Sequence, residues 1–388
     1  MNQETDRLAL PSILEASRNI TGFFEMSEPD VKEGLSVLID DLNHNAKLSQ
    51  GGIAGQQAAI TNMLCNRFRL DALFLAHPEI EAETIRAPII IVGMPRSGTT
   101  KMQRMLAASG EFQYLPLWKI LNPAPLDQPV DGQADLRIAM AEQAMAVMKE
   151  YFPDFYAGHP MDALEADEEV FMADLVMRGW NPCYSANVPD YERWLEGQDF
   201  GVWYDYLKKL LQLFQWQNKS TKPWLLKTCE HLPYLDHLFR VFPDATIVHC
   251  HRDPVTTIAS LGALTAASWR MNCDDVDPVA AARFVLKHMA KQMAGYMGLR
   301  PLLEHDHRFV DVGYPEIVGN TQAVIERIYQ ATALPLTQES YQHMALWEQN
   351  NPPGKHGKHS YSLTQLGLSE IMISNAVAPY IKRFSHFM

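Results

Sequence analysis

The first part of the chain contains three stretches in which apolar residues recur every three or four positions. They read "LPSILEASRNITGFF", "DVKEGLSVLIDDL" and "QQAAITNMLCNRFRLDALFLA". This spacing places the apolar side chains along one side of an α-helix. The pattern therefore predicts an N-terminal helical extension over residues 1–86.

From residue 87 onward, short apolar runs alternate with helical patterns. The runs cover residues 89–92, 223–227, 245–250 and 308–314. Buried strands that alternate with helices form right-handed crossovers and a mostly parallel sheet. We expect an α/β domain over residues 87–388, with helices on both sides of a central sheet and a variable insert at about 112–217.

Several segments between and after these runs predict helices. The insert contains helical patterns at 134–153, at 166–175 ("ADEEVFMADL") and at 201–216. Further patterns follow three of the apolar runs, at 229–242, 254–267 and 321–332. Their positions favour helices that pack on the sheet.

Composition excludes several classes of protein. The net charge of −13 argues against a general nucleic-acid or anionic membrane surface, because both need a basic field. No apolar run approaches the roughly 20 residues that span a bilayer. The first residues, "MNQETDRLAL", lack the pattern of a secretory signal, so a cytoplasmic location is expected. The five cysteines are scattered and indicate neither a disulfide framework nor a zinc site.

"PIIIVGMPRSGTT", residues 88–100, reads as a strand, a glycine-containing turn and the start of a helix. Backbone N–H groups in such a turn bind anions, and Gly98 lets the backbone approach a ligand. An ATP-binding loop has lysine where Thr99 stands, whereas here Arg96 supplies the charge. Hydroxyl donors come from Ser97, Thr99 and Thr100. Alone, the pattern fits an ordinary tight turn as well as an anion site.

A second candidate anion site lies in "HCHRDPVTTIAS". Asp253 is a favourable N-cap and Pro254 a favourable first helical residue, so a helix is predicted to begin there. Arg252 then lies at the carboxyl end of a strand, where open α/β sheets bind ligands. Ser260 follows about two turns along the helix. A surface pair between Arg252 and Asp253 is the alternative interpretation.

Together, "IIIVGMPRSGTT" and "TIVHCHRDPVTTIASL" resemble the sulfotransferase family, whose members use 3′-phosphoadenosine 5′-phosphosulfate (PAPS). The first segment resembles the 5′-phosphosulfate loop, in which Arg or Lys occupies the position of Arg96. The second resembles the 3′-phosphate motif, with Arg252 and, eight residues on, Ser260. The resemblance implies a P-loop-like fold, PAPS as sulfuryl donor and no metal.

Two further segments are similar to parts of the same family. "VDVGYPEIV" implies that Tyr314 lies near the adenine. "NPPGKHGKHSYSL" resembles the C-terminal basic loop that closes over the 3′-phosphate, with Lys355, Gly357 and Lys358; a solvated loop is the alternative. This tail and "WLLKTCEHL" resemble the bacterial branch that acts on diverse hydroxyl acceptors. The resemblance covers roughly residues 87–385.

Sulfuryl transfer requires positioning, charge stabilisation and a base that removes the acceptor proton. "WLLKTCEHLPYL" places Lys227 at a strand end and His231 in the following turn. The resemblance implies that His231 is the base and that Lys227 stabilises charge on the oxygen between sulfur and phosphorus. The alternative base is a carboxylate. In "MDALEADEEVFMAD", residues 161–174, the i, i+3, i+4 spacing would give one helical face to Glu165, Glu168 and Glu169.

The expected acceptor is a small hydrophobic or ring-bearing hydroxyl compound. Its pocket is expected to come from the insert and from helices at about 262–300. The insert supplies aromatic residues that could line this pocket or simply form core, namely Tyr151, Phe152, Phe155, Tyr156, Trp180, Tyr184, Tyr191, Trp194, Trp203 and Tyr204.

Two other functions remain possible at this stage. A P-loop kinase or NTPase would need the missing loop lysine and a strand-end aspartate for Mg²⁺. A non-catalytic protein could retain the nucleotide cradle without turnover. His249 and His251 share one side of a strand, but the sequence places no third ligand nearby, so a metal site is not expected.

Overall fold

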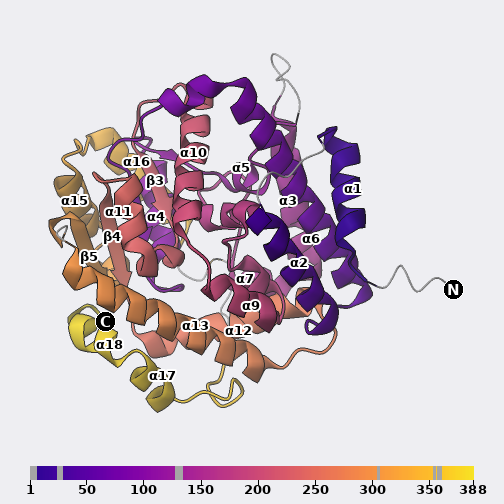
Figure 1. Ribbon diagram of the computed structural model, residues 1–388. Helices are drawn as coiled ribbons and strands as arrows, with labels where there is room; N and C mark the ends of the chain where they lie inside the picture. Colours follow the sequence, from indigo (N-terminus) through magenta and orange to yellow (C-terminus); the bar gives the residue numbers. More distant parts are fainter. Residues whose placement is uncertain (1–6, 24–28, 127–133, 304–305, 353–354, 356–360) are drawn as a thin grey trace.

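A five-stranded parallel sheet forms the centre of the computed structural model, which describes residues 7–23, 29–126, 134–303, 306–352, 355 and 361–388 (Figure 1). The strands lie in the order β2-β3-β1-β4-β5. They are β1 (Ile89–Val92), β2 (Gln113–Tyr114), β3 (Trp224–Lys227), β4 (Thr246–His251) and β5 (Phe309–Gly313). The four predicted strands are confirmed. β2 was not predicted, because its two residues are too few to show a periodicity.

The register brings the carboxyl ends of four strands to one edge of the sheet. Ile91 of β1 pairs with Lys227 of β3, and His251 of β4 pairs with Gly313 of β5. The segments that follow these strands therefore leave the sheet side by side. This edge is where ligands bind in open α/β sheets.

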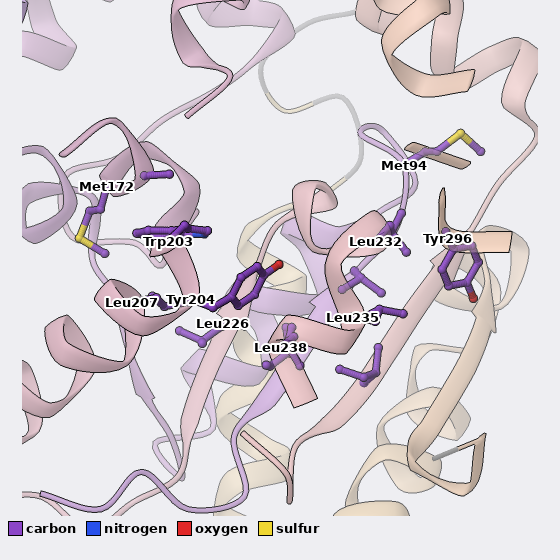
Figure 2. Close-up of a cluster of buried hydrophobic side chains, with 14 of the residues drawn as sticks. Met94, Met172, Trp203, Tyr204, Leu207, Leu226, Leu232, Leu235, Leu238 and Tyr296 are labelled. Atoms are coloured by element: carbon purple, nitrogen blue, oxygen red, sulfur yellow. The ribbon is translucent and has the colours of Figure 1, made fainter. Parts of the chain in front are cut away.

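Helices cover both faces of the sheet. One face packs against α4 (Thr99–Ala108), α15 (Thr321–Thr332) and α16 (Gln338–Asn350). The other face packs against α10 (Gly201–Asn218), α11 (Leu235–Val241), α12 (Pro254–Asn272), α13 (Pro278–Leu299), α17 (Glu370–Ala376) and α18 (Ala378–Phe384). Figure 2 shows part of this second cluster, in which Tyr204 of α10 lies among Leu226, Leu235 and Leu238.

The three predicted N-terminal helices are confirmed as α1 (Leu10–Thr21), α2 (Pro29–His44) and α3 (Gln50–Ala76). They pack against the insert helices α8 (Asn181–Ser185) and α9 (Pro189–Glu196) and share one buried cluster with them. The carboxylate of Asp41 accepts hydrogen bonds from the backbone N–H groups of Asp190 and Tyr191, at 2.7 and 2.8 Å. The extension is therefore tied directly to the insert.

The prediction of a helix over 166–175 was wrong. Its first residues are extended, since Asp167 N donates to Leu115 O at 3.0 Å, and a 3₁₀ helix, η3 (Glu169–Val176), begins only at Glu169. The three glutamates therefore do not share a helical face. The predicted helix over 229–242 divides into η4 (Cys229–Tyr234) and α11. Pro233 lies inside η4 and has no N–H for a regular helix.

The remaining helices connect these layers. They are η2 (Pro78–Ala82), α5 (Leu117–Leu121), α6 (Leu136–Tyr151), α7 (Pro153–Gly158), η5 (Arg300–Leu302), η6 (Asp306–Arg308), α14 (Tyr314–Gly319) and η7 (Ser385–Phe387). Within the described ranges, none of the helices combines the length and apolar character needed to cross a membrane.

Candidate active site

The turn between β1 and α4 has the backbone of an anion cradle. Gly98 adopts φ 93°, a left-handed conformation that favours glycine, and Arg96 adopts φ 72°. A Cβ on Gly98 would lie 3.2 Å from the ring of Tyr314. The Ser97 hydroxyl is buried and has no hydrogen-bond partner among the described residues. Buried polar groups usually have a partner, so this hydroxyl fits a site that binds a ligand.

The two candidate anion sites lie together. The Arg252 guanidinium donates to the carbonyl oxygen of Arg96 at 2.7 Å and lies 3.8 Å above the ring centre of Tyr314. The Arg96 guanidinium donates to Gly158 O at 2.8 Å, which brings the end of α7 onto the turn. Neither arginine pairs with a carboxylate in the described part of the chain. Burial, and then repulsion from the Arg252 charge, lower the pKa of Arg96. A bound anion would offset both effects, because it favours the charged guanidinium.

The other predicted nucleotide residues are partly described. Ser260 is mostly buried in α12, two turns beyond Arg252. Lys355 is exposed and donates to Asn351 at 3.0 Å, while Gly357 and Lys358 lie outside the described residues. The Tyr361 hydroxyl donates to Thr256 O at 3.2 Å, so Tyr361 contacts the first turn of α12.

Lys227 and Glu168 form an ion pair beside the turn. The Lys227 ammonium contacts the Glu168 carboxylate and donates to Thr100 Oγ1 at 3.3 Å. Lys227 is only 1% exposed, whereas the Glu168 side chain is 21% exposed and lines the main cavity. Burial raises the pKa of Glu168, against the opposing effect of Lys227. A carboxylate with a raised pKa that reaches a cavity is suited to accept a proton.

His231 lies behind this pair and is not among the residues that line the cavity. Its side chain is buried, with Nδ1 2.9 Å from the Tyr204 hydroxyl and Nε2 2.8 Å from Glu169 Oε1. The other oxygen of Glu169 accepts from the backbone N–H of Lys227 at 2.9 Å. Both imidazole nitrogens are therefore engaged. Glu165 accepts instead from the Trp347 indole at 3.2 Å.

A cavity of about 430 Å³ extends from the turn beneath α6, α7 and α12. Arg96, Thr99, Thr100, Glu168 and Thr228 line its polar part. Most of its other lining is apolar and includes Leu117, Leu121, Met145, Met148, Phe155, Met161, Phe171, Leu261, Leu264 and Met271. Of the ten aromatic residues considered above, Phe155, Trp180 and Tyr184 line the cavity, whereas Tyr191, Trp203 and Tyr204 are core.

His159, which no sequence pattern singled out, lines the cavity just after α7. Burial lowers the pKa of His159 to about 4, with the positive charges of Lys227 and Arg96 acting in the same direction. The imidazole is therefore neutral at neutral pH. No local motif marks this residue. Its neighbour Gly158 is brought to the turn by the hydrogen bond from Arg96, which joins segments 62 positions apart.

The structure supplies the third neighbour that the sequence did not place beside His249 and His251. Asp311 pairs with His249 across β4 and β5, and its Oδ1 lies 2.9 Å from His251 Nε2. Arg300 also donates to Asp311, at 2.9 Å. Burial raises the pKa of Asp311, but the hydrogen bonds from His251 and Arg300 hold it below its usual value. The positive charge of Arg300, which is bound to Asp311, would repel a divalent cation at this position.

Comparison with known proteins assigns the family. A model of the sulfotransferase family, Sulfotransfer_3, matches residues 88–338, and the chain belongs to this family. Omega-hydroxy-beta-dihydromenaquinone-9 sulfotransferase Stf3 from Mycobacterium bovis is 24% identical over 269 residues. That match covers 65% of this chain and 65% of the relative, and the Mycobacterium tuberculosis protein of the same name matches equally.

Two solved structures share the fold. Sulfotransferase STF1 from Mycobacterium tuberculosis H37Rv has a TM-score of 0.83 and 24% identity, over 96% of this chain and 99% of that chain. Sulfotransferase STF9 from Mycobacterium avium has a TM-score of 0.85 and 25% identity, over 97% and 96%. The predicted family and the sulfotransferase fold are thus confirmed.

Proposed function

We propose that the protein transfers a sulfuryl group from PAPS to a hydroxyl of an acceptor, giving a sulfate ester and 3′,5′-ADP. The contact between Arg252 and the Arg96 carbonyl carries this proposal. It brings the Arg96 and Arg252 segments together at adjoining strand ends. Among the described residues, neither guanidinium group has a carboxylate partner. A nucleotide with anionic groups at its 5′ and 3′ positions matches such a pair.

The proposal gives each predicted nucleotide-binding residue a role. The 5′-phosphosulfate would be held by the turn through Arg96, Ser97, Gly98, Thr99 and Thr100. Arg252 and Ser260 would hold the 3′-phosphate, and Tyr314 would lie near the adenine. Lys355, Gly357 and Lys358 would close over the 3′-phosphate. No metal ion is required in this scheme.

Glu168 is the proposed base. It lines the cavity and has a raised pKa, whereas His231 is buried with both nitrogens engaged. The acceptor oxygen forms a bond to sulfur, the bond from sulfur to the phosphate oxygen breaks, and the acceptor proton moves to Glu168. Lys227 stabilises the charge that develops on the departing phosphate oxygen.

His231 has a positioning role in this mechanism. It holds Glu169 Oε1, while Glu169 Oε2 accepts from the Lys227 backbone. The imidazole therefore fixes the end of β3, from which the Lys227 side chain reaches Glu168.

The acceptor is proposed to be a hydrophobic molecule with a free hydroxyl. The cavity has a largely apolar lining. The relative Stf3 is named for a hydroxylated dihydromenaquinone, which is a hydrophobic acceptor. Both observations favour this class over a strongly polar acceptor.

Calorimetric titration tests the donor assignment. We expect 3′,5′-ADP to bind in the presence of EDTA and to bind much more weakly to Arg252→Ala. Tight binding of Mg-ATP, with no binding of 3′,5′-ADP, would instead support the kinase or NTPase alternative. Incubation with labelled PAPS and a panel of alcohols then separates an enzyme from a non-catalytic nucleotide-binding protein.

A further inference from the structure

The acceptor cavity has a second polar region besides the one around Glu168. It contains Glu230 of η4, Tyr184 of α8 and Thr265 of α12. The mechanism above uses none of these side chains. Glu230 is only 7% exposed, so its carboxylate is a buried group at the cavity wall.

Among the described residues, no lysine or arginine pairs with Glu230. Its Oε1 lies 3.3 Å from His288 Nε2 and accepts from Cys229 Sγ at 3.9 Å, and its Oε2 contacts the Gln292 amide. His288 and Gln292 lie one turn apart on α13, and the His288 ring is 4.2 Å from that of Trp180. In the described ranges, His288 is the sole ion-pair partner of Glu230. A carboxylate offers about four lone-pair positions, so positions remain for a further donor.

Two hydroxyl groups of residues that line the same cavity also lack partners in the described part of the chain. The Tyr184 hydroxyl and Thr265 Oγ1 are buried and form no hydrogen bond with any described residue. Thr265 is 2% exposed, and its side chain lines the cavity. Since buried polar groups are rarely left unbonded, the Tyr184 and Thr265 hydroxyl groups add unused hydrogen-bonding capacity to the cavity wall that carries Glu230.

We propose that Glu230, Tyr184 and Thr265 form a subsite for a second polar group of the acceptor, an ammonium or other strong donor distinct from the hydroxyl that is sulfated. This inference rests on the proposed function and narrows the acceptor to an amphiphilic alcohol. A purely apolar acceptor would displace water from Glu230 and leave its remaining lone-pair position without a donor. Sites with unpaired buried polar groups discriminate strongly against such ligands.

Matched acceptors test the subsite by binding, independently of turnover. The probes are unbranched alcohols from butanol to decanol and the corresponding ω-amino alcohols, titrated into protein saturated with 3′,5′-ADP. At one or more chain lengths we expect the amino alcohol to bind about 10- to 100-fold more tightly, as a charged hydrogen bond provides. Glu230→Gln should remove most of this preference, and Thr265→Val should reduce it.

Glu326→Gln is the matched control, because Glu326 is an exposed carboxylate on α15 that bonds to Gln322. It should retain the full preference. Circular dichroism verifies that each variant is folded, and Thr265→Val provides the test if Glu230→Gln does not fold.

Equal binding of both probe series to the wild-type protein at every length would overturn the subsite. A preference that persists in Glu230→Gln would overturn the assignment to Glu230. If the preference is present but PAPS sulfates no probe, the proposed function fails while the subsite stands.

Discussion

Glu168 and Glu169 are adjacent in sequence, yet their surroundings give them different chemistry. Glu169 is fully buried, and both of its oxygens are occupied, by His231 and by the Lys227 backbone. Glu168 lines the cavity, and its one side-chain partner among the described residues is the Lys227 ammonium. Only Glu168 can therefore reach an acceptor in the cavity without breaking a buried network.

Replacing the proposed base should reduce turnover selectively. We expect Glu168→Gln to lower kcat by about 10²- to 10⁴-fold, the usual contribution of a general base. Affinity for 3′,5′-ADP should change little, because Glu168 is not assigned to the nucleotide. Glu165→Gln is the control and should retain near-normal kcat. A Glu168→Gln protein with near-normal turnover would exclude this base.

The raised pKa of Glu168 predicts the pH dependence of the reaction. The base accepts a proton only when ionised, so kcat/KM should fall as pH decreases through the pKa of Glu168. Because burial raises that pKa, the acid limb should lie above the value of about 4.3 for a free glutamate. A pH profile of kcat/KM measures the inflection. An inflection at or below 4.3 would contradict the assignment.

At the scale of elements, the start of α4 combines an anion cradle with a left-handed glycine. Gly98→Ala should destabilise the fold by about 1–2 kcal/mol and also place a methyl group against Tyr314. We therefore expect weaker 3′,5′-ADP binding as well as lower stability. Urea unfolding and calorimetry measure the two effects.

Gly110 provides the matched comparison. It has φ 76°, and nothing lies within 4 Å of a Cβ placed there. Gly110→Ala should lower stability by a similar amount and leave 3′,5′-ADP binding unchanged. A similar loss of affinity in both variants would indicate a general effect of destabilisation.

Elements with strong local patterns could be predicted from the sequence. β1 is a run of four buried residues, and α12 begins with the Asp253 cap, whose side chain accepts from Val255 and Thr256. The segment 166–175 could not be predicted in this way. Its hydrophobic spacing suits a helix, but hydrogen bonds to residues 115–117 hold its first part extended. Contacts between distant segments overrode the local pattern.

The difference between local patterns and contacts of distant segments also applies to the candidate site, which consists of the proposed nucleotide-binding residues and the proposed base. The residues proposed to bind the nucleotide lie in continuous strand, turn and helix segments, so their motifs could be recognised. The choice between His231 and Glu168 depends on which side chain reaches the cavity. That in turn depends on contacts between Glu169 and residues about 60 positions away. Sequence spacing carries no information about such a contact.

At the scale of the whole molecule, the C-terminus packs behind the edge of the sheet that carries Arg252 and Tyr314. His251, next to Arg252, stacks on Phe387 with ring centres 5.0 Å apart, and its Nδ1 lies 2.8 Å from the Tyr380 hydroxyl. Gly313 precedes Tyr314, and a Cβ there would lie 2.4 Å from Phe387 O. The last turn of the chain thus supports the strand ends that present Arg252 and Tyr314.

Gly313→Ala tests this support, because the added methyl group must displace Phe387 or the end of β5. We expect a loss of about 1–3 kcal/mol in the free energy of unfolding, as for other overpacked sites. We also expect weaker 3′,5′-ADP binding through Tyr314. In a chain that ends at Ser385, the same substitution should cost much less, because Phe387, which the methyl group would contact, is absent. A double-mutant cycle by urea unfolding measures this coupling, and an unchanged cost in the shortened chain would show that the C-terminus does not constrain β5.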